Sequence, residues 1–207
     1  MLWTWWQRGD LSGPGQAFRE VVAQTPTEYL TVPAALALVH AEAGDAEASL
    51  CQLRSLAALG WENLADDQTE GVSLAMAAAA CSVLGTRASD FAPPLYEAMR
   101  RYAGTAVVVR APAAACLGPA DHYLGLLAGA MGDLALAEVH HEAALRLARR
   151  MGSPPFVAAA ELELARTLRL RRPTGDEERV AVLLRSAEES ALAMGLHRLA
   201  RLAAEPG

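Results

Sequence analysis

Residues 122–145 read HYLGLLAGAMGDLALAEVHHEAAL, and this stretch is the most informative about the architecture of the chain. Its first half is apolar but rich in glycine and alanine, so a helix formed there is thin enough for a neighbouring helix to approach closely. Gly132 is a natural helix terminator, and Asp133 is a natural N-cap for the amphipathic helix that follows. The stretch therefore predicts two tightly packed, antiparallel helices.

The same pattern of apolar helix, glycine, polar residue and amphipathic helix recurs along the chain. It appears around AALALVHAEAGDAEASL and AMAAAACSVLGTRASDF, and less clearly around LARTLRLRRPTGDEERVAVL. The turn glycines are Gly44, Gly85, Gly132 and Gly175, which gives a spacing of about 40 residues, within the range typical of helical solenoids.

The composition favours an all-α protein. Of the 207 residues 53% are hydrophobic but only 5% are aromatic, whereas a sheet would require more β-branched and aromatic residues. The net charge of −6 argues against direct nucleic-acid binding, which depends on a basic surface. Arginines crowd between residues 146 and 172, which indicates either a solvated helix face or a local site for an anion or an acidic peptide.

Hydrophobic periodicity and helix-ending glycines predict a succession of helices. We expect them over 2–8, 12–24, 27–43, 45–59, 69–84, 88–103, 119–131, 133–151, 154–171, 175–195 and 197–204. Residues 105–118 are the exception, because Val107 to Val109 favour an extended segment and Pro112 opposes a helix. No second strand of similar quality occurs, so we expect an extended connector and no sheet.

Residues 122–145 resemble a tetratricopeptide unit, whose consensus has small residues where its two helices cross. The positions that match are Leu124, Gly125, Gly132, Ala137, Ala144 and Leu145. Two positions depart from the consensus, because Asp121 and His141 stand where it has large aromatic residues. The resemblance implies a solenoid of about five antiparallel helix pairs, with N-terminal repeats over 1–104, a connector over 105–118 and C-terminal repeats over 119–207.

Residues 115–196, with the segments 61–85 and 95–104, resemble the C-terminal helical-repeat region of large actinobacterial regulators. Those proteins join a tetratricopeptide-like array to an ATPase module, and sometimes to an adenylate cyclase or a LuxR-type DNA-binding domain. The sequence has no GxxxxGK[ST] phosphate loop, no helix-turn-helix signature and no recognisable cyclase carboxylates. The resemblance therefore implies the sensing or interaction part of a transcriptional or signalling regulator.

Histidines and acids do not predict a metal site or a catalytic site. His140 and His141 are adjacent on a helix and point about 100° apart, so they cannot both bind one ion comfortably. Glu161 and Glu163 are two positions apart on a helix, so their side chains also point in different directions and do not form a catalytic pair. We expect no catalytic residue, no cofactor and no metal, and we expect that the chain is not an enzyme.

The three cysteines, Cys51, Cys81 and Cys116, are odd in number and widely spaced. This pattern favours neither a disulfide framework nor a zinc motif. Because their neighbours are apolar, we expect buried, inert thiols in a cytoplasmic protein.

The N-terminal tryptophans Trp3, Trp5 and Trp6 cannot all face one core. They either cap the first helix pair, or they contact an upstream repeat or a second copy of the chain. A homodimer is therefore one possibility. The apolar run in MLWTWWQRGD is too short for a signal peptide, and the stretch from Gly71 to Gly85 is shorter than the roughly 20 residues that span a bilayer, so we expect no membrane segment.

In tetratricopeptide geometry the first helix of each pair lines the concave surface. His122, Leu126, Arg166 and Arg169 are then the candidate groove residues, and the two arginines share a face. They either bind an acidic group on a partner or pair with Glu161, Glu163 or Glu138. The sequence predicts a non-catalytic module that binds a protein segment; the alternatives are a sensor for a small anionic ligand and an enzyme without a recognisable motif.

Overall fold

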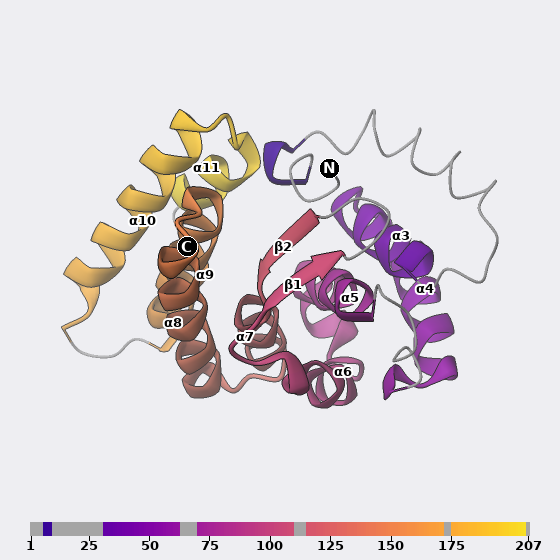
Figure 1. The fold of residues 1–207 in the computed structure, drawn as a ribbon. Coiled ribbons are helices and arrows are strands. Elements are labelled where there is room, and N and C mark those ends of the chain that lie inside the picture. Colours follow the sequence, from indigo (N-terminus) through magenta and orange to yellow (C-terminus); the bar gives the residue numbers. More distant parts are fainter. Residues whose placement is uncertain (1–5, 10–30, 63–69, 110–114, 172–174, 206–207) are drawn as a thin grey trace.

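Helices make up most of the chain in the computed structural model, which describes residues 6–9, 31–62, 70–109, 115–171 and 175–205 (Figure 1). In chain order the elements are α3 (Thr31–Glu42), α4 (Ala46–Leu59), α5 (Glu70–Leu84), η2 (Gly85–Ala88), α6 (Ala92–Met99), η3 (Arg100–Tyr102), β1 (Ala106–Val109), β2 (Ala115–Pro119), α7 (Ala120–Ala130), α8 (Leu134–Arg150), α9 (Pro154–Arg171), α10 (Glu177–Ala193) and α11 (His197–Ala204). The mostly helical structure agrees with the alanine-rich composition. The helix expected over 12–24 lies outside the described residues.

The expected glycine turns and aspartate caps are present. Gly44 and Gly132 have φ angles of 77° and 81°, a left-handed conformation that residues with a Cβ rarely adopt. Asp45 and Asp133 then cap α4 and α8, because each carboxylate accepts a hydrogen bond from the backbone N–H three residues later, at 3.1 and 3.0 Å. These local signals explain why the sequence places both turns correctly.

The single helix expected over 88–103 is wrong. The structure has the eight-residue helix α6, with the 3-10 helices η2 before it and η3 after it. Pro93 and Pro94 explain the late start of α6, because proline lacks a backbone N–H and is tolerated only in the first turn of a helix.

The expectation that the chain forms no sheet was also wrong, because β1 and β2 pair as antiparallel strands. Ala106 lies opposite Pro119, and the register shifts after Val107. The sequence of β2, ACLGP, has no β-branched residue and so has no strand pattern of its own. Tertiary packing holds it, since Gly118 lies so close to the Phe156 ring that a Cβ would come within 2.8 Å of that ring.

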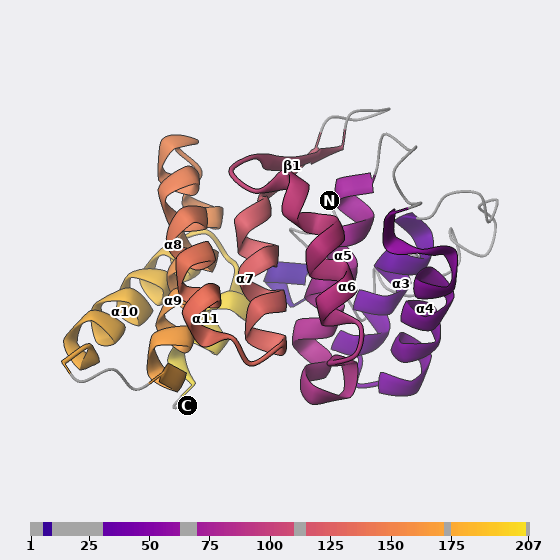
Figure 2. The same cartoon turned by 90° about the horizontal axis from the view of Figure 1, so that it is seen from below.

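Successive helices pack against one another along the chain. α3 contacts α4 and α5, α5 contacts α6 and α7, and the contacts continue from α7 through α8, α9 and α10 to α11. Figure 2 shows this order as a row from α10 at one side to α3 and α4 at the other. Close packing is possible because the buried face of α5 is mostly alanine: Ala75, Ala77, Ala78, Ala79 and Ala80 are all buried.

The two ends of the described chain meet, since α11 lies beside residues 6–9 (Figure 1). The 18-residue segment Gly71–Ala88 is long and apolar enough to cross a membrane by length and composition alone, but 56% of it is buried inside the structure. Packing of α5 between α3 and α7 accounts for this apolar character.

Candidate functional site

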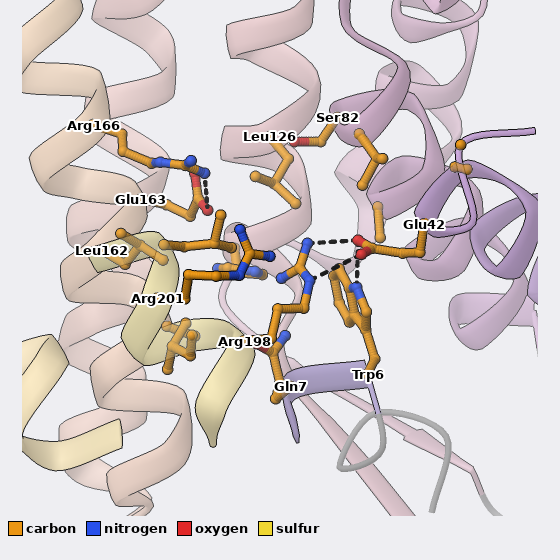
Figure 3. Close-up of a pocket in the computed structure, with 18 residues that line it drawn as sticks. Trp6, Gln7, Glu42, Ser82, Leu126, Leu162, Glu163, Arg166, Arg198 and Arg201 are labelled. Atoms are coloured by element: carbon orange, nitrogen blue, oxygen red, sulfur yellow. Dashed lines mark hydrogen bonds and ion pairs between the residues drawn. The ribbon is translucent and has the colours of Figure 1, made fainter. Parts of the chain in front are cut away.

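A groove runs along α5, α7 and α9, and α3, α11 and residues 6–7 lie at one end of it, where Figure 3 shows the first cavity. It consists of a first cavity of about 360 Å³ beside α11 and a second cavity of about 670 Å³ farther along α7 and α9. Ser82, Leu126, Glu163 and Arg166 line both cavities, so the two lie next to each other, and we call them together the groove.

All four groove residues suggested by the sequence line these cavities. His122 lines the first cavity, Arg169 lines the second, and Leu126 and Arg166 line both. They come together because α7 and α9 present them from opposite walls. The sequence reasoning missed the contribution of α11 and of residues 6–7, because no local pattern shows that the two ends of the chain meet.

A cluster of Trp6, Glu42 and Arg198 joins those ends. The Arg198 guanidinium donates two hydrogen bonds to the Glu42 carboxylate, at 2.5 and 3.0 Å, although the two residues are 156 positions apart. The Trp6 indole N–H donates to the same carboxylate at 2.7 Å, and the Arg198 guanidinium carbon lies 4.7 Å from the Trp6 ring centre. Only 13% of the Arg198 side chain and 17% of the Glu42 side chain are exposed, so water competes little for the hydrogen bonds of this bidentate pair. The cluster therefore links α11 to α3 at the end of the first cavity (Figure 3).

Trp6 is itself buried, so its ring contacts the first cavity and does not form an exposed patch. This position fits the capping interpretation of the tryptophans better than self-association. Trp3 and Trp5 lie outside the described residues, and a role for them in a dimer stays a prediction.

Two buried histidines lie beneath the groove. His122 is 8% exposed and His141 is 2% exposed, and their rings are 6.2 Å apart in an edge arrangement. The Nδ1 atom of each ring is buried and has no hydrogen-bond partner. The His141 ring lies directly against Gly125, where a Cβ would come within 2.4 Å of the ring.

Burial keeps both imidazoles uncharged near neutral pH. Burial lowers the pKa of His122 below its usual 6.5, and the Glu163 carboxylate only partly opposes this shift. Burial, together with the neighbouring His122 and His140, holds the pKa of His141 well below 6.5. Each ring therefore offers one donor and one acceptor rather than a charge.

The arginines of the groove differ in how they are satisfied. Arg166 forms a loose ion pair with Glu163, at 3.5 Å, as one of the sequence interpretations expects. Arg169 is half-buried and has no ion pair among the described residues. Glu138, the other expected partner, pairs instead with Arg171 and Arg179. One cation at the second cavity is thus left without a protein partner in the described chain.

A buried polar network was not foreseen from the sequence. His140 Nδ1 lies 2.8 Å from the Asp121 carboxylate, and His140 Nε2 lies 2.8 Å from the Tyr96 hydroxyl. Because a carboxylate only accepts hydrogen bonds, Nδ1 carries the proton and Nε2 accepts from Tyr96. The Gly104 N–H donates to the second Asp121 oxygen at 2.7 Å. The departure of Asp121 from the aromatic consensus was the one sequence signal of this network.

The ionisation states of the network favour a structural role. Burial alone would raise the pKa of Asp121, but the hydrogen bonds from His140 and Gly104 bring it below its usual 3.8. Burial raises the pKa of Tyr96 above 10, so its hydroxyl stays protonated and is a poor nucleophile. None of the three side chains lines either cavity. The network joins α6, α7 and α8.

The remaining chemical candidates are separated in the structure. Glu161 is buried and pairs with Arg149 of α8 at 3.1 Å, whereas Glu163 faces the groove, so the two acids do point apart. Cys81 is buried, which raises its pKa to about 12. Burial of all three cysteines was wrong, because Cys51 and Cys116 are exposed. Cys51 lies on the solvent face of α4, and Cys116 lies on the hairpin that the sequence did not predict.

Within the described residues, no group of three or more His, Cys, Asp or Glu side chains is placed to hold a metal ion. The groove is therefore the site to which the geometry points, with its arginines, buried histidines and apolar walls. No protein-family model matches the chain, and no curated protein and no solved structure matches it.

Proposed function

We propose that this chain is a non-catalytic interaction module that binds a protein segment in its groove. The position of the two cavities next to each other along three helices is the observation that carries the proposal, because such a groove suits an extended chain. Its walls combine arginines with apolar side chains such as Leu126, Leu134 and Leu170. Leu170 is 68% exposed at the second cavity.

We further propose that the helices form a tetratricopeptide-like solenoid of about five pairs. The pairs would be α3/α4, α5/α6, α7/α8 and α9/α10, with α11 beginning a fifth. Contacts in chain order support this arrangement. So does the close approach of α7 and α8, where Gly125 leaves room for His141 and where Ala137 and Ala144 are buried.

The wider setting of the proposal rests on the resemblance of residues 115–196 to actinobacterial regulators. A cytoplasmic regulator that senses or recruits another protein through this groove is the setting that we propose. Self-association through Trp3 and Trp5 is part of the same hypothesis, and sedimentation velocity of the purified chain would test it.

Blocking the groove tests peptide binding directly. Gly129 is helical, lines the second cavity and has open space where a Cβ would be, so Gly129→Trp would place a large side chain in the groove. We expect peptides selected on the native chain from a random twelve-residue phage library to lose binding to Gly129→Trp. Gly129→Ala is the matched control and should bind normally. Peptides that bind both variants equally would place the site elsewhere.

A sensor for a small anionic ligand is the second candidate function. The second cavity has a volume of about 670 Å³, and small-molecule sites usually range from about 300 to 1,000 Å³. This function predicts that a bound anion raises the melting temperature and that Arg166→Ala abolishes the rise while the fold is retained. Enzymatic activity is the least supported candidate, because the relay of Tyr96, His140 and Asp121 lies outside both cavities.

A further inference from the structure

We propose that the groove recognises an acidic residue of the bound peptide, whose carboxylate binds Arg169 and Arg166 at the second cavity. This inference rests on the proposed function and names the chemistry of its partner. An apolar side chain next to that acid would pack against Leu170, which lines the second cavity and is 68% exposed.

The charge of the groove is the first feature. Among the described lining residues, two glutamates face four arginines: Glu42 and Glu163 against Arg166, Arg169, Arg198 and Arg201. The chain as a whole carries a charge of −6, so the groove has a charge opposite in sign to that of the whole chain. Local positive charge on an acidic protein attracts anionic groups to that place.

The distribution of the ion pairs selects the second cavity. Arg198 is fully engaged by Glu42, and Arg201 pairs with Glu205 at 2.6 Å. Arg166 keeps only the 3.5 Å contact with Glu163, and Arg169 has no partner in the described part of the chain. Arg166 and Arg169 lie one helical turn apart on the same face of α9, so one carboxylate can reach both guanidinium groups.

The second cavity also has an unsatisfied buried polar atom. His141 lines it, is 2% exposed and leaves its Nδ1 without a hydrogen-bond partner. This nitrogen packs against Gly125 of α7, where a Cβ would lie 2.5 Å from it, so the helix contact covers it. Recognition of the peptide therefore rests on the arginines of the cavity and not on this imidazole.

The amount of charge favours a carboxylate over a phosphate. Arg166 and Arg169 against Glu163 leave one net positive charge at the second cavity. A carboxylate carries a single negative charge, whereas a phosphate ester carries about −1.5 to −2 near pH 7. The cavity floor is formed by Gly125, Gly129 and Ala130, and at Gly129 it leaves open space for a peptide backbone to approach.

The test compares arginine variants with peptides selected from the random twelve-residue library on the full chain. We expect the selected peptides to share an Asp or Glu, and replacement of that acid by its amide should weaken binding about ten-fold or more. Arg169→Ala should have a similar effect, and Arg169→Lys should recover part of the affinity through charge alone. Arg185→Ala, an exposed arginine of α10 away from the groove, is the control and should change nothing.

Each outcome separates the inference from the proposed function. One outcome is that the selected peptides lose binding to Gly129→Trp, share no Asp or Glu, and bind Arg169→Ala as tightly as the native chain. This outcome would overturn the inference but support the proposed function. Failure to select any peptide would overturn both. Saturable thermal stabilisation by sodium malonate or inorganic phosphate that requires Arg169, without peptide binding, would replace the peptide with a small anion. Equal loss on Arg185→Ala would show a nonspecific charge effect and reject the inference.

Discussion

The His141 imidazole rests on Gly125, so that a Cβ at Gly125 would lie 2.4 Å from one ring carbon and 2.5 Å from Nδ1. Gly125→Ala must therefore displace a buried ring, and we expect a loss of about 1–3 kcal/mol of stability, measured by urea unfolding. Gly129→Ala is the matched control on the same helix. With nothing within 4 Å of its Cβ, it should gain up to about 1 kcal/mol from helix propensity. Equal effects of the two variants would contradict the close contact.

Acid should destabilise the protein through the two buried histidines. Their folded-state pKa values lie below the usual 6.5, so the unfolded chain binds more protons as the pH falls below 6.5. The free energy of unfolding therefore does not depend on these two histidines above that pH. Below it the free energy of unfolding decreases, by at most about 1.4 kcal/mol per pH unit for each histidine. Asp121, whose pKa is lowered, adds to this loss only near and below 3.8.

Urea unfolding between about pH 7.5 and pH 4.5 would measure this dependence. His141→Phe keeps a ring against Gly125 and removes one titrating group, so its stability should fall less steeply with decreasing pH. The exposed His197 is the control, and His197→Gln should leave the slope unchanged. An unchanged slope in His141→Phe would show that His141 does not carry the acid sensitivity.

Removing members of the Tyr96, His140 and Asp121 network should cost unequal amounts. Tyr96→Phe removes one hydrogen bond and should cost about 1 kcal/mol of stability. Asp121→Ala leaves both the His140 N–H and the Gly104 N–H unpaired and should cost about 2–3 kcal/mol or more. A double-mutant cycle by chemical denaturation measures the coupling between them. Strictly additive losses would show that the three side chains do not act as a network.

Breaking the pair between Arg198 and Glu42 should release α11 from α3. Arg198→Ala leaves the largely buried Glu42 carboxylate with Trp6 as its one remaining partner among the described residues, and we expect a loss on the order of 3 kcal/mol. Hydrogen exchange should become faster in α11 and in residues 6–9. The exposed pair of Arg201 and Glu205 is the comparison, and Arg201→Ala should cost about 0.3–0.5 kcal/mol. Protection of α11 that survives Arg198→Ala would show that apolar contacts alone hold it.

Local features were read correctly from the sequence at helix-ending glycines and at aspartate caps. The glycine turns at Gly44 and Gly132 and the caps at Asp45 and Asp133 occur as expected. His122, Leu126, Arg166 and Arg169, which tetratricopeptide geometry suggested as groove residues, line the two cavities, and their binding of a partner stays a prediction.

Other features depend on segments that are distant in the sequence. The strand β2 has no strand pattern, and it pairs because the fold brings it beside β1 and against Phe156. The exposure of Cys51 and Cys116 likewise depends on which face of each element meets solvent.

The sequence by itself thus determined the helical class, most helix boundaries and the small residues at the helix crossings, since these follow from backbone preferences within a few positions. Only the tertiary structure decided that Glu42 meets Arg198, that Tyr96 meets His140, and that Arg169 is left without a partner in the described chain. Such contacts join residues tens to hundreds of positions apart, and they exist only after helix packing has brought those residues together.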